Sequence, residues 1–286
     1  MVTERTIRTA RLTHRILEAG EGPLVICVHG YPDTAQTWQD LLPALAAAGF
    51  HAVAPWTRGY PPTELAPDGD YSVPALGRDV LALADALGAD TFKLVGHDWG
   101  ASTVYMATGL APERVERLVT IAIPPARAVR PGPKVVWTLR HFWYYALPWL
   151  PERSLRANGW QAVRDICRRW SPSWEIPDDE FAHTVAALEA PGGLQGALGY
   201  YRSFVRGVFG AAARESLTVQ GKRLTVPTSL IYGDEDIATY LYEGDLGRCF
   251  ADGVPHEVVR ITGGGHFVHR EKVAETNAAI VRWLTS

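Results

Sequence analysis

The stretch Gly96-His97-Asp98-Trp99-Gly100 lies between a short apolar run at 92–95 and a segment with helical spacing at 99–110. A strand that enters a helix through a sharp, glycine-flanked turn holds the central side chain at the edge of a sheet. The free N–H groups at the start of the helix favour an anion and lower its pKa. The sequence therefore predicts that Asp98 is a nucleophile that forms an ester with its substrate, rather than a carboxylate that only caps the helix.

Strands alternate with helices on both sides of this turn. Buried strands are expected at 24–28, 51–55, 92–95 and 117–123, and helices at 33–49, 73–88 and 99–110. Short connections between alternating elements are typical of parallel strands joined by right-handed crossovers. We therefore predict an α/β fold, with a mostly parallel central sheet and helices on both faces.

The pattern changes after Pro125. Residues 126–217 hold six of the ten tryptophans and helical stretches at 178–188 and 194–208, but no buried strand. Strand character returns at 228–232 and 257–261, and a helix is expected at 273–284. We expect one α/β core, 1–125 and 218–286, interrupted by a helical cap at 126–217. Insertions of this kind lie at the carboxyl ends of the strands, where open α/β sheets bind ligands.

The composition of the 286 residues is that of an ordinary globular protein, with a net charge of −3. This net charge gives no electrostatic reason to expect nucleic acid or an anionic membrane as a partner. The first 20 residues lack the apolar segment of a signal peptide, and no apolar run reaches the ~18 residues of a membrane span. The three cysteines are far apart, which argues against disulfides or structural zinc and predicts a cytoplasmic protein. Composition does not decide the oligomeric state.

Two further motifs follow Asp98 in the order that places an acid and then a base after the nucleophile. Tyr232-Gly233-Asp234-Glu235-Asp236 follows one expected strand, and Gly263-Gly264-Gly265-His266 follows the next. The His266 imidazole could activate water to hydrolyse the ester, while a carboxylate orients the imidazole. Asp234, Glu235 and Asp236 are the carboxylates that the first of these motifs offers.

A fourth motif, His29-Gly30-Tyr31-Pro32, directly follows the strand at 24–28. A turn at this point can direct the backbone N–H of Tyr31, together with that of Trp99, at the oxyanion formed when water attacks the ester. The side chain of His29 is expected to make structural hydrogen bonds.

Together with the helical insertion, these four motifs resemble the α/β-hydrolase superfamily, and most closely the branch that holds epoxide hydrolases and haloalkane dehalogenases. The resemblance covers nearly the whole chain. It implies Asp236 as the acid, because the family spacing is Gly-x-x-Asp, with Asp234 as the alternative. Aspartate in place of serine at position 98 argues against esterases and lipases.

The cap decides between the two activities of this branch. An epoxide hydrolase needs proton donors above Asp98, and a phenol with a pKa near ~10 can donate while staying protonated at neutral pH. The stretch Leu198-Gly199-Tyr200-Tyr201-Arg202 resembles the epoxide-hydrolase cap signature, which implies Tyr201 as one donor. Counting back from Pro148, the resemblance places the second donor, usually a tyrosine, at His141; Tyr144 and Tyr145 are the alternatives.

We therefore expect an epoxide hydrolase without cofactor or metal, whose partners are a small apolar epoxide and water. Its expected catalytic residues are Asp98, His266, Asp236, Tyr201 and His141, and its oxyanion donors are Tyr31 and Trp99. A haloalkane dehalogenase is the first alternative, with the indole of Trp99 as one halide donor, but no second donor is evident because Tyr31 follows His-Gly. A small-molecule receptor that kept the pocket without turnover is the second alternative.

Overall fold

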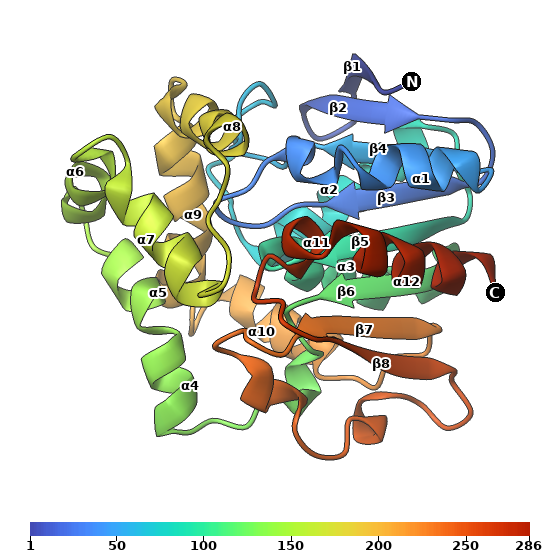
Figure 1. The fold of residues 1–286 in the computed structure, drawn as a ribbon. Helices are drawn as coiled ribbons and strands as arrows, with labels where there is room; N and C mark the ends of the chain where they lie inside the picture. The colour runs from blue at the N-terminus through green and yellow to red at the C-terminus, as the bar shows by residue number, and fades with distance from the viewer.

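The computed structural model describes residues 1–286 and contains one eight-stranded sheet covered by helices (Figure 1). The strand order is β1-β2-β4-β3-β5-β6-β7-β8. The strands are β1 Thr3–Arg8, β2 Thr13–Ala19, β3 Leu24–Val28, β4 His51–Pro55, β5 Phe92–His97, β6 Val115–Ile121, β7 Thr228–Gly233 and β8 His256–Ile261. The strands from β3 to β8 pair in parallel, and β2 runs antiparallel to both β1 and β4. The expected mostly parallel α/β fold is confirmed.

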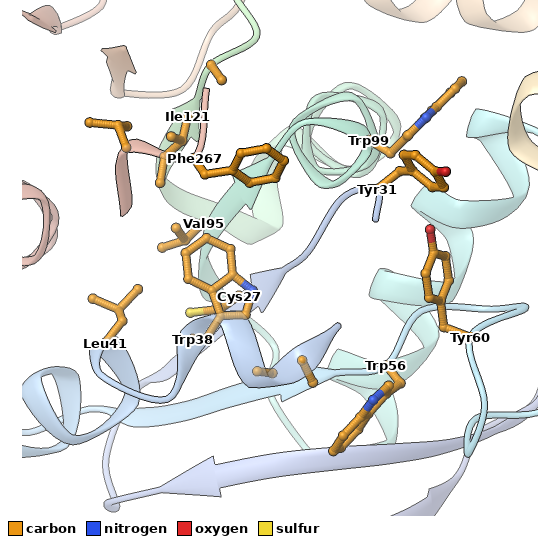
Figure 2. Packing of buried hydrophobic residues seen from close by; sticks show 14 of the residues in the cluster. Cys27, Tyr31, Trp38, Leu41, Trp56, Tyr60, Val95, Trp99, Ile121 and Phe267 are labelled. Carbon is orange, nitrogen blue, oxygen red and sulfur yellow. The ribbon is translucent and has the colours of Figure 1, made fainter. Parts of the chain in front are cut away.

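Helices cover both faces of the sheet, which explains why its central strands are apolar on both sides. Every residue of β3 and of β5 is buried. The core helices are α1 Leu41–Ala47, α2 Val73–Ala86, α3 Trp99–Leu110, α11 Val268–Glu271 and α12 Val273–Thr285. Apolar residues of α1 and α12 join one buried cluster, and most of those of α2 and α3 join a second. Figure 2 shows part of the first cluster, with Cys27 and Val95 from neighbouring strands among aromatic rings.

The N-terminal part differs from the sequence expectation in two places. The strands β1 and β2 have no clear sequence signal, because β1 is an edge strand in which only Ile7 is buried. The single helix expected at 33–49 is wrong. The segment forms a short 3-10 helix η1, Ala35–Trp38, and then α1. The Thr34 side chain caps η1 by accepting from the Gln36 N–H. Helix α1 begins after it, with Asp40 as its N-cap residue.

Seven helices lie between β6 and β7, at the carboxyl ends of the parallel strands (Figure 1). They are α4 Pro133–Thr138, α5 Arg140–Tyr145, α6 Leu150–Arg156, α7 Gln161–Trp170, α8 Asp178–Glu189, α9 Gly193–Arg206 and α10 Ala211–Gln220. The boundary expected at residue 217 falls inside α10. Short 3-10 turns complete the chain: η2 Pro112–Arg114, η3 Ala126–Ala128, η4 Thr239–Tyr242 and η5 Gly247–Cys249. None of the helices is long and apolar enough to cross a membrane.

Helix α9 fixes this helical layer to the core. The Tyr200 hydroxyl lies 2.9 Å from the Thr57 hydroxyl and donates to the Arg58 carbonyl at 2.7 Å. Gly196 packs so closely on the loop after β4 that a β-carbon there would lie 2.2 Å from the Gly59 carbonyl oxygen. The helix that carries Tyr201 is therefore held at a fixed height above the sheet.

Candidate active site

Asp98 occupies a strained turn between β5 and α3. Its backbone has φ 52° and ψ −119°, a conformation that non-glycine residues rarely adopt. Glycines on either side of the turn make it possible. A β-carbon at Gly100 would lie 2.0 Å from the Val28 carbonyl oxygen, and one at Gly30 would lie 2.4 Å from the Asp98 β-carbon. The side chain of Asp98 is thus fixed at the carboxyl edge of the sheet.

The structure brings Asp98, His266 and Asp236 together in one chain of polar contacts. The His266 Nδ1–H donates to Asp236 Oδ2 at 2.9 Å, and His266 Nε2 lies 3.5 Å from Asp98 Oδ2. The other oxygen, Asp98 Oδ1, accepts from the backbone N–H of Tyr31 at 2.9 Å. Trp99 is the first residue of α3, where a backbone N–H has no partner within the helix. The Tyr31 N–H is therefore the backbone donor that contacts the Asp98 carboxylate, and the Trp99 N–H stays a predicted donor.

Burial and charge set the protonation of this group. Burial alone would lower the pKa of His266, but the carboxylates of Asp236 and Asp98 raise that pKa to about 10. Burial would raise the pKa of Asp98, but His266, His97 and the Tyr31 N–H outweigh it and lower that pKa. At neutral pH the resting site therefore holds an imidazolium between two carboxylates.

The other carboxylates of the 232–236 motif are used elsewhere or face solvent. Asp234 accepts from the Gly263 N–H at 2.7 Å and pairs with Arg260 at 2.9 Å. Glu235 is exposed. Asp236 is buried, and its second oxygen, Oδ1, accepts from the Ala238 N–H at 2.8 Å, which fixes the carboxylate toward His266. Asp236 is thus the carboxylate of this motif that contacts the imidazole.

Tyr201 lies among aromatic rings above the nucleophile. Its ring centroid is 5.2 Å from that of Trp99, 5.4 Å from that of Tyr31 and 4.8 Å from that of Phe142. The side chain is fully buried, and its O–H has no hydrogen-bond acceptor. Burial and then the negative charge of Asp98 raise the pKa of this phenol well above its usual value. Tyr201 therefore stays protonated with an unused donor.

His141 is the other expected donor and lines the cavity above Asp98. Its Nδ1 lies 3.2 Å from the Thr138 carbonyl oxygen, so Nδ1 carries the hydrogen and Nε2 is left for the cavity. Burial lowers the pKa of His141 to about 4, with a further contribution from Arg169. The Tyr144 hydroxyl pairs with Ser154 at 2.5 Å, and the Tyr145 hydroxyl accepts from Tyr31 at 3.3 Å. Neither tyrosine lines the cavity.

A cavity of about 650 Å³ opens above the site, and 20 of its 33 lining residues are hydrophobic. Asp98, Trp99, His141, Asp236 and His266 are among these lining residues. Tyr201 is fully buried and is not among the lining residues, but Trp99 and Phe142, whose rings contact it, are. The cavity is large enough for a small organic molecule and is lined as such sites commonly are.

Three buried side chains behind His266 were missed by the sequence reasoning. His97 Nε2–H donates to the His266 carbonyl at 2.9 Å, and His97 Nδ1 lies 3.7 Å from Asp33 Oδ2. His269 Nε2 is also 3.7 Å from Asp33 Oδ2. The three potential metal-ligand atoms lie within 4.8 Å of one another. The Thr37 hydroxyl already contacts both Asp33, at 3.1 Å, and His269, at 2.8 Å.

This group supports the catalytic loop from below, because His97 holds the backbone of His266. Burial raises the pKa of Asp33 to about 7 and lowers that of His97 to about 3. Each of the three residues is close to a sequence motif. Asp33 directly follows His-Gly-Tyr-Pro, His97 directly precedes Asp98, and His269 is three residues after His266. Only the folded chain brings them together.

Comparison with known proteins identifies the family. A family model described as "alpha/beta hydrolase fold" matches residues 23–273. Epoxide hydrolase A of Mycobacterium tuberculosis is 28% identical over 99% of this chain and 97% of its own length. An epoxide hydrolase of Caballeronia sordidicola is 29% identical over 99% of this chain and 94% of its own. The chain belongs to the alpha/beta hydrolase fold family, as the motifs predicted.

Solved structures agree with this family. The crystal structure of epoxide hydrolase A from Mycobacterium thermoresistibile matches with a TM-score of 0.85 and 25% identity, covering 99% of this chain and 98% of that one. An epoxide hydrolase from Vigna radiata matches with a TM-score of 0.81 and 25% identity, over 99% and 97%. The helical layer over the sheet is included in both superpositions, because each covers nearly the whole chain.

Proposed function

We propose that this protein is an epoxide hydrolase that converts an apolar epoxide to a vicinal diol through an ester on Asp98. The observation that carries the proposal is the contact of His266 with Asp98, together with the buried, unused O–H of Tyr201, whose ring packs on Trp99 next to Asp98. A nucleophilic carboxylate, a water-activating imidazole and a protonated donor are the groups that this two-step reaction needs. The epoxide hydrolases among its relatives support the same activity.

In the first step Asp98 Oδ2 attacks an epoxide carbon, because Oδ1 is held by the Tyr31 N–H. The carbon–oxygen bond of the ring breaks, and its electron pair stays on the oxygen. Tyr201 gives its proton to this oxygen, since an alkoxide is a stronger base than even a buried phenolate. In its neutral form His141 offers only the lone pair of Nε2, so it donates only as an imidazolium.

In the second step water hydrolyses the ester. The His266 imidazolium first gives a proton to the Tyr201 phenolate. This transfer leaves His266 as a neutral imidazole. His266, oriented by Asp236, then takes a proton from water as the water attacks the ester carbon, and the Tyr31 and Trp99 N–H groups hold the oxyanion. The bond between the ester carbon and the alkyl oxygen then breaks, and the second proton of the attacking water passes to that oxygen. Release of the diol leaves the Asp98 carboxylate and the His266 imidazolium, so atoms and charge balance over the cycle. The helices from α4 to α10 serve as the cap that excludes bulk water.

Isotope labelling tests the covalent step. With enzyme in excess over styrene oxide in ¹⁸O-labelled water, the first turnover should give diol that carries unlabelled oxygen from Asp98. Later turnovers should give labelled diol, because water has by then replaced that oxygen. Label in the diol of the first turnover would contradict the covalent mechanism.

A substrate panel tests the choice of activity. We expect diol from epoxides and no halide from simple bromoalkanes. Release of halide without formation of diol would show a haloalkane dehalogenase instead, and saturable binding without any turnover would show a receptor. Either result would overturn the proposal.

A further inference from the structure

Exposed apolar side chains gather on one part of the cap. Thirteen large hydrophobic residues of the chain are exposed, and nine of them lie within 127–156 and 202–214. These two segments are called the basic face below. The nine are Val136, Trp137, Trp143, Leu147, Trp149, Leu150, Phe204, Val208 and Phe209. Trp149 is 69% exposed and Phe209 is 88% exposed, so most of each apolar side chain faces solvent.

The same two segments carry nearly all of their charge as arginine and lysine. They contain nine basic residues and one acidic residue, Glu152, which pairs with Arg202 at 2.7 Å. The basic face thus has a net charge of +8, while the rest of the chain has 19 basic and 30 acidic side chains. The net charge of −3, from which the sequence predicted no anionic membrane partner, is therefore very unevenly distributed.

Hydrogen bonds join the two segments, and a cation–π contact joins two helices of the first. Arg202 and Arg206 on α9 donate to the carbonyls of Leu147 and Ala146, each at 2.9 Å, so the end of α9 lies against the end of α5. The Arg140 guanidinium lies 4.4 Å from the centre of the Trp137 ring, which joins α5 to α4. Figure 1 shows α4, α5 and α6 on the outer side of the cap, away from the sheet.

We propose that the basic face docks on the surface of an anionic lipid bilayer. Tryptophan and phenylalanine side chains enter the region of the lipid headgroups, and arginines beside them bind lipid phosphates. A second copy of the chain does not fit, because a two-fold dimer would place two faces of charge +8 against each other. Nucleic acid would satisfy the charge but would leave Val136, Leu147 and Leu150 in water.

Docking in this way would bring the bilayer to the mouth of the catalytic cavity. Phe204 and Val208 belong to the basic face, line the cavity and are about half exposed. An apolar epoxide dissolved in the bilayer could then enter without crossing water; this consequence rests on the proposed function. The docking itself does not, because it depends only on the surface.

Co-sedimentation with vesicles tests the docking. We expect the protein to sediment with phosphatidylcholine vesicles that contain phosphatidylglycerol and to stay in solution with phosphatidylcholine alone. Rising salt should release it, because the attraction is electrostatic. Binding should also shift tryptophan emission to shorter wavelength. An Asp98→Asn variant should bind equally well, which separates this test from that of the activity.

Charge reversal on the basic face should weaken binding more than the same change elsewhere. Arg130 and Arg153 are exposed, and neither takes part in a salt bridge or a side-chain hydrogen bond. Each basic residue near an anionic surface contributes about fivefold to binding, so Arg130→Glu with Arg153→Glu should weaken it by about 25-fold or more. The matched control is Arg8→Glu with Lys272→Glu, which makes the same charge change on the core and should bind clearly more tightly.

The apolar contribution has its own variants. Trp149→Ser with Phe209→Ser should weaken binding about tenfold or more at constant charge, while Val258→Ser, an exposed change on β8, should not. Equal binding to neutral and anionic vesicles, or no binding to either, would overturn the proposal. So would a double charge reversal that binds as tightly as the unchanged protein.

Discussion

The charge of Asp98 controls the charge of His266. In the resting site two carboxylates raise the pKa of His266 to about 10, so the imidazole is protonated and cannot act as a base. Esterification removes the negative charge of Asp98 and with it one of the two causes of the raised pKa. Formation of the ester therefore prepares the base that hydrolyses it, without any conformational change.

An Asp98→Asn variant imitates this loss of charge. The pKa of His266 should fall below about 10 in the variant, because only Asp236 is left to raise it. An NMR titration of the imidazole between pH 5 and 11 measures the change. Asp234→Asn is the control, since Asp234 pairs with Arg260 and should leave the pKa of His266 unchanged. An unchanged titration in Asp98→Asn would contradict the coupling.

The two cap donors should differ in their effect on ring opening. Tyr201→Phe removes an unpaired buried hydroxyl and should slow ester formation about a hundredfold or more, measured by stopped flow. His141→Gln should have a smaller effect at neutral pH, because burial lowers the pKa of His141 to about 4 and leaves it neutral. As pH falls toward 4, the unchanged protein should gain relative to His141→Gln. The control is Tyr144→Phe, whose hydroxyl pairs with Ser154; an equal loss there would contradict the choice of donors.

At the scale of residues, sequence motifs predict the groups that lie next to Asp98 because each motif follows a parallel strand. The ends of parallel strands meet at one edge of the sheet, so residues far apart in sequence become neighbours. The same reasoning does not reach Asp33 and His269, because their contact through Thr37 depends on side-chain packing behind the edge. It also could not show that Nδ1 of His141 is held by the Thr138 carbonyl.

At the scale of elements, the turn at Asp98 depends on how closely α3 approaches β3. A Gly100→Ala β-carbon would lie 2.0 Å from the Val28 carbonyl oxygen, so the helix must move away from the strand. We expect the free energy of unfolding to fall by about 3 kcal/mol and the activity to be lost with it. Urea denaturation measures the first effect and diol formation the second.

Gly132→Ala provides the control for this glycine. Its backbone is extended and nothing lies within 4 Å of a β-carbon at this position, so stability should change little. A Gly100→Ala protein as stable as Gly132→Ala would show that the elbow tolerates a wider turn than the structure has.

Sequence patterns predict the buried elements better than the exposed ones. Strands β3 and β5 are apolar on both faces and have clear limits in the sequence, whereas β1 is polar along most of its length. The helix expected at 33–49 is interrupted because Thr34 caps a short 3-10 turn before α1 begins. Local capping of this kind competes with the helical spacing of apolar residues and is not visible in that spacing.

At the scale of the whole molecule, Arg270 joins the core to the cap. Its guanidinium donates to Glu180 on α8 at 2.7 Å and to Asp40 before α1 at 2.6 Å. An Arg270→Gln change should lower the free energy of unfolding by about 2 kcal/mol, less than for a fully buried pair because both carboxylates reach solvent. Faster hydrogen exchange confined to α8 would show that the cap loosens first.

Arg282→Gln is the matched control, because Arg282 pairs with Glu257 on the surface of the core alone. It should change stability by less than about 1 kcal/mol and leave exchange in α8 unaltered. Equal effects of the two changes would mean that Arg270 contributes no more than an ordinary surface ion pair.

The cap is inserted between two strands that pair directly with each other. Leu118 of β6 is in register with Thr228 of β7, so the sheet is completed only when the chain closes a loop of roughly a hundred residues. Doubling the length of such a loop adds only about 0.6 kcal/mol to its closure, so a large insertion at this point costs little stability. The delay falls on folding rate instead, and β7 and β8 should join the sheet late unless the cap has already folded and brought its two ends together. The insertion of the cap between β6 and β7 thus also determines the order in which the strands join the sheet during folding.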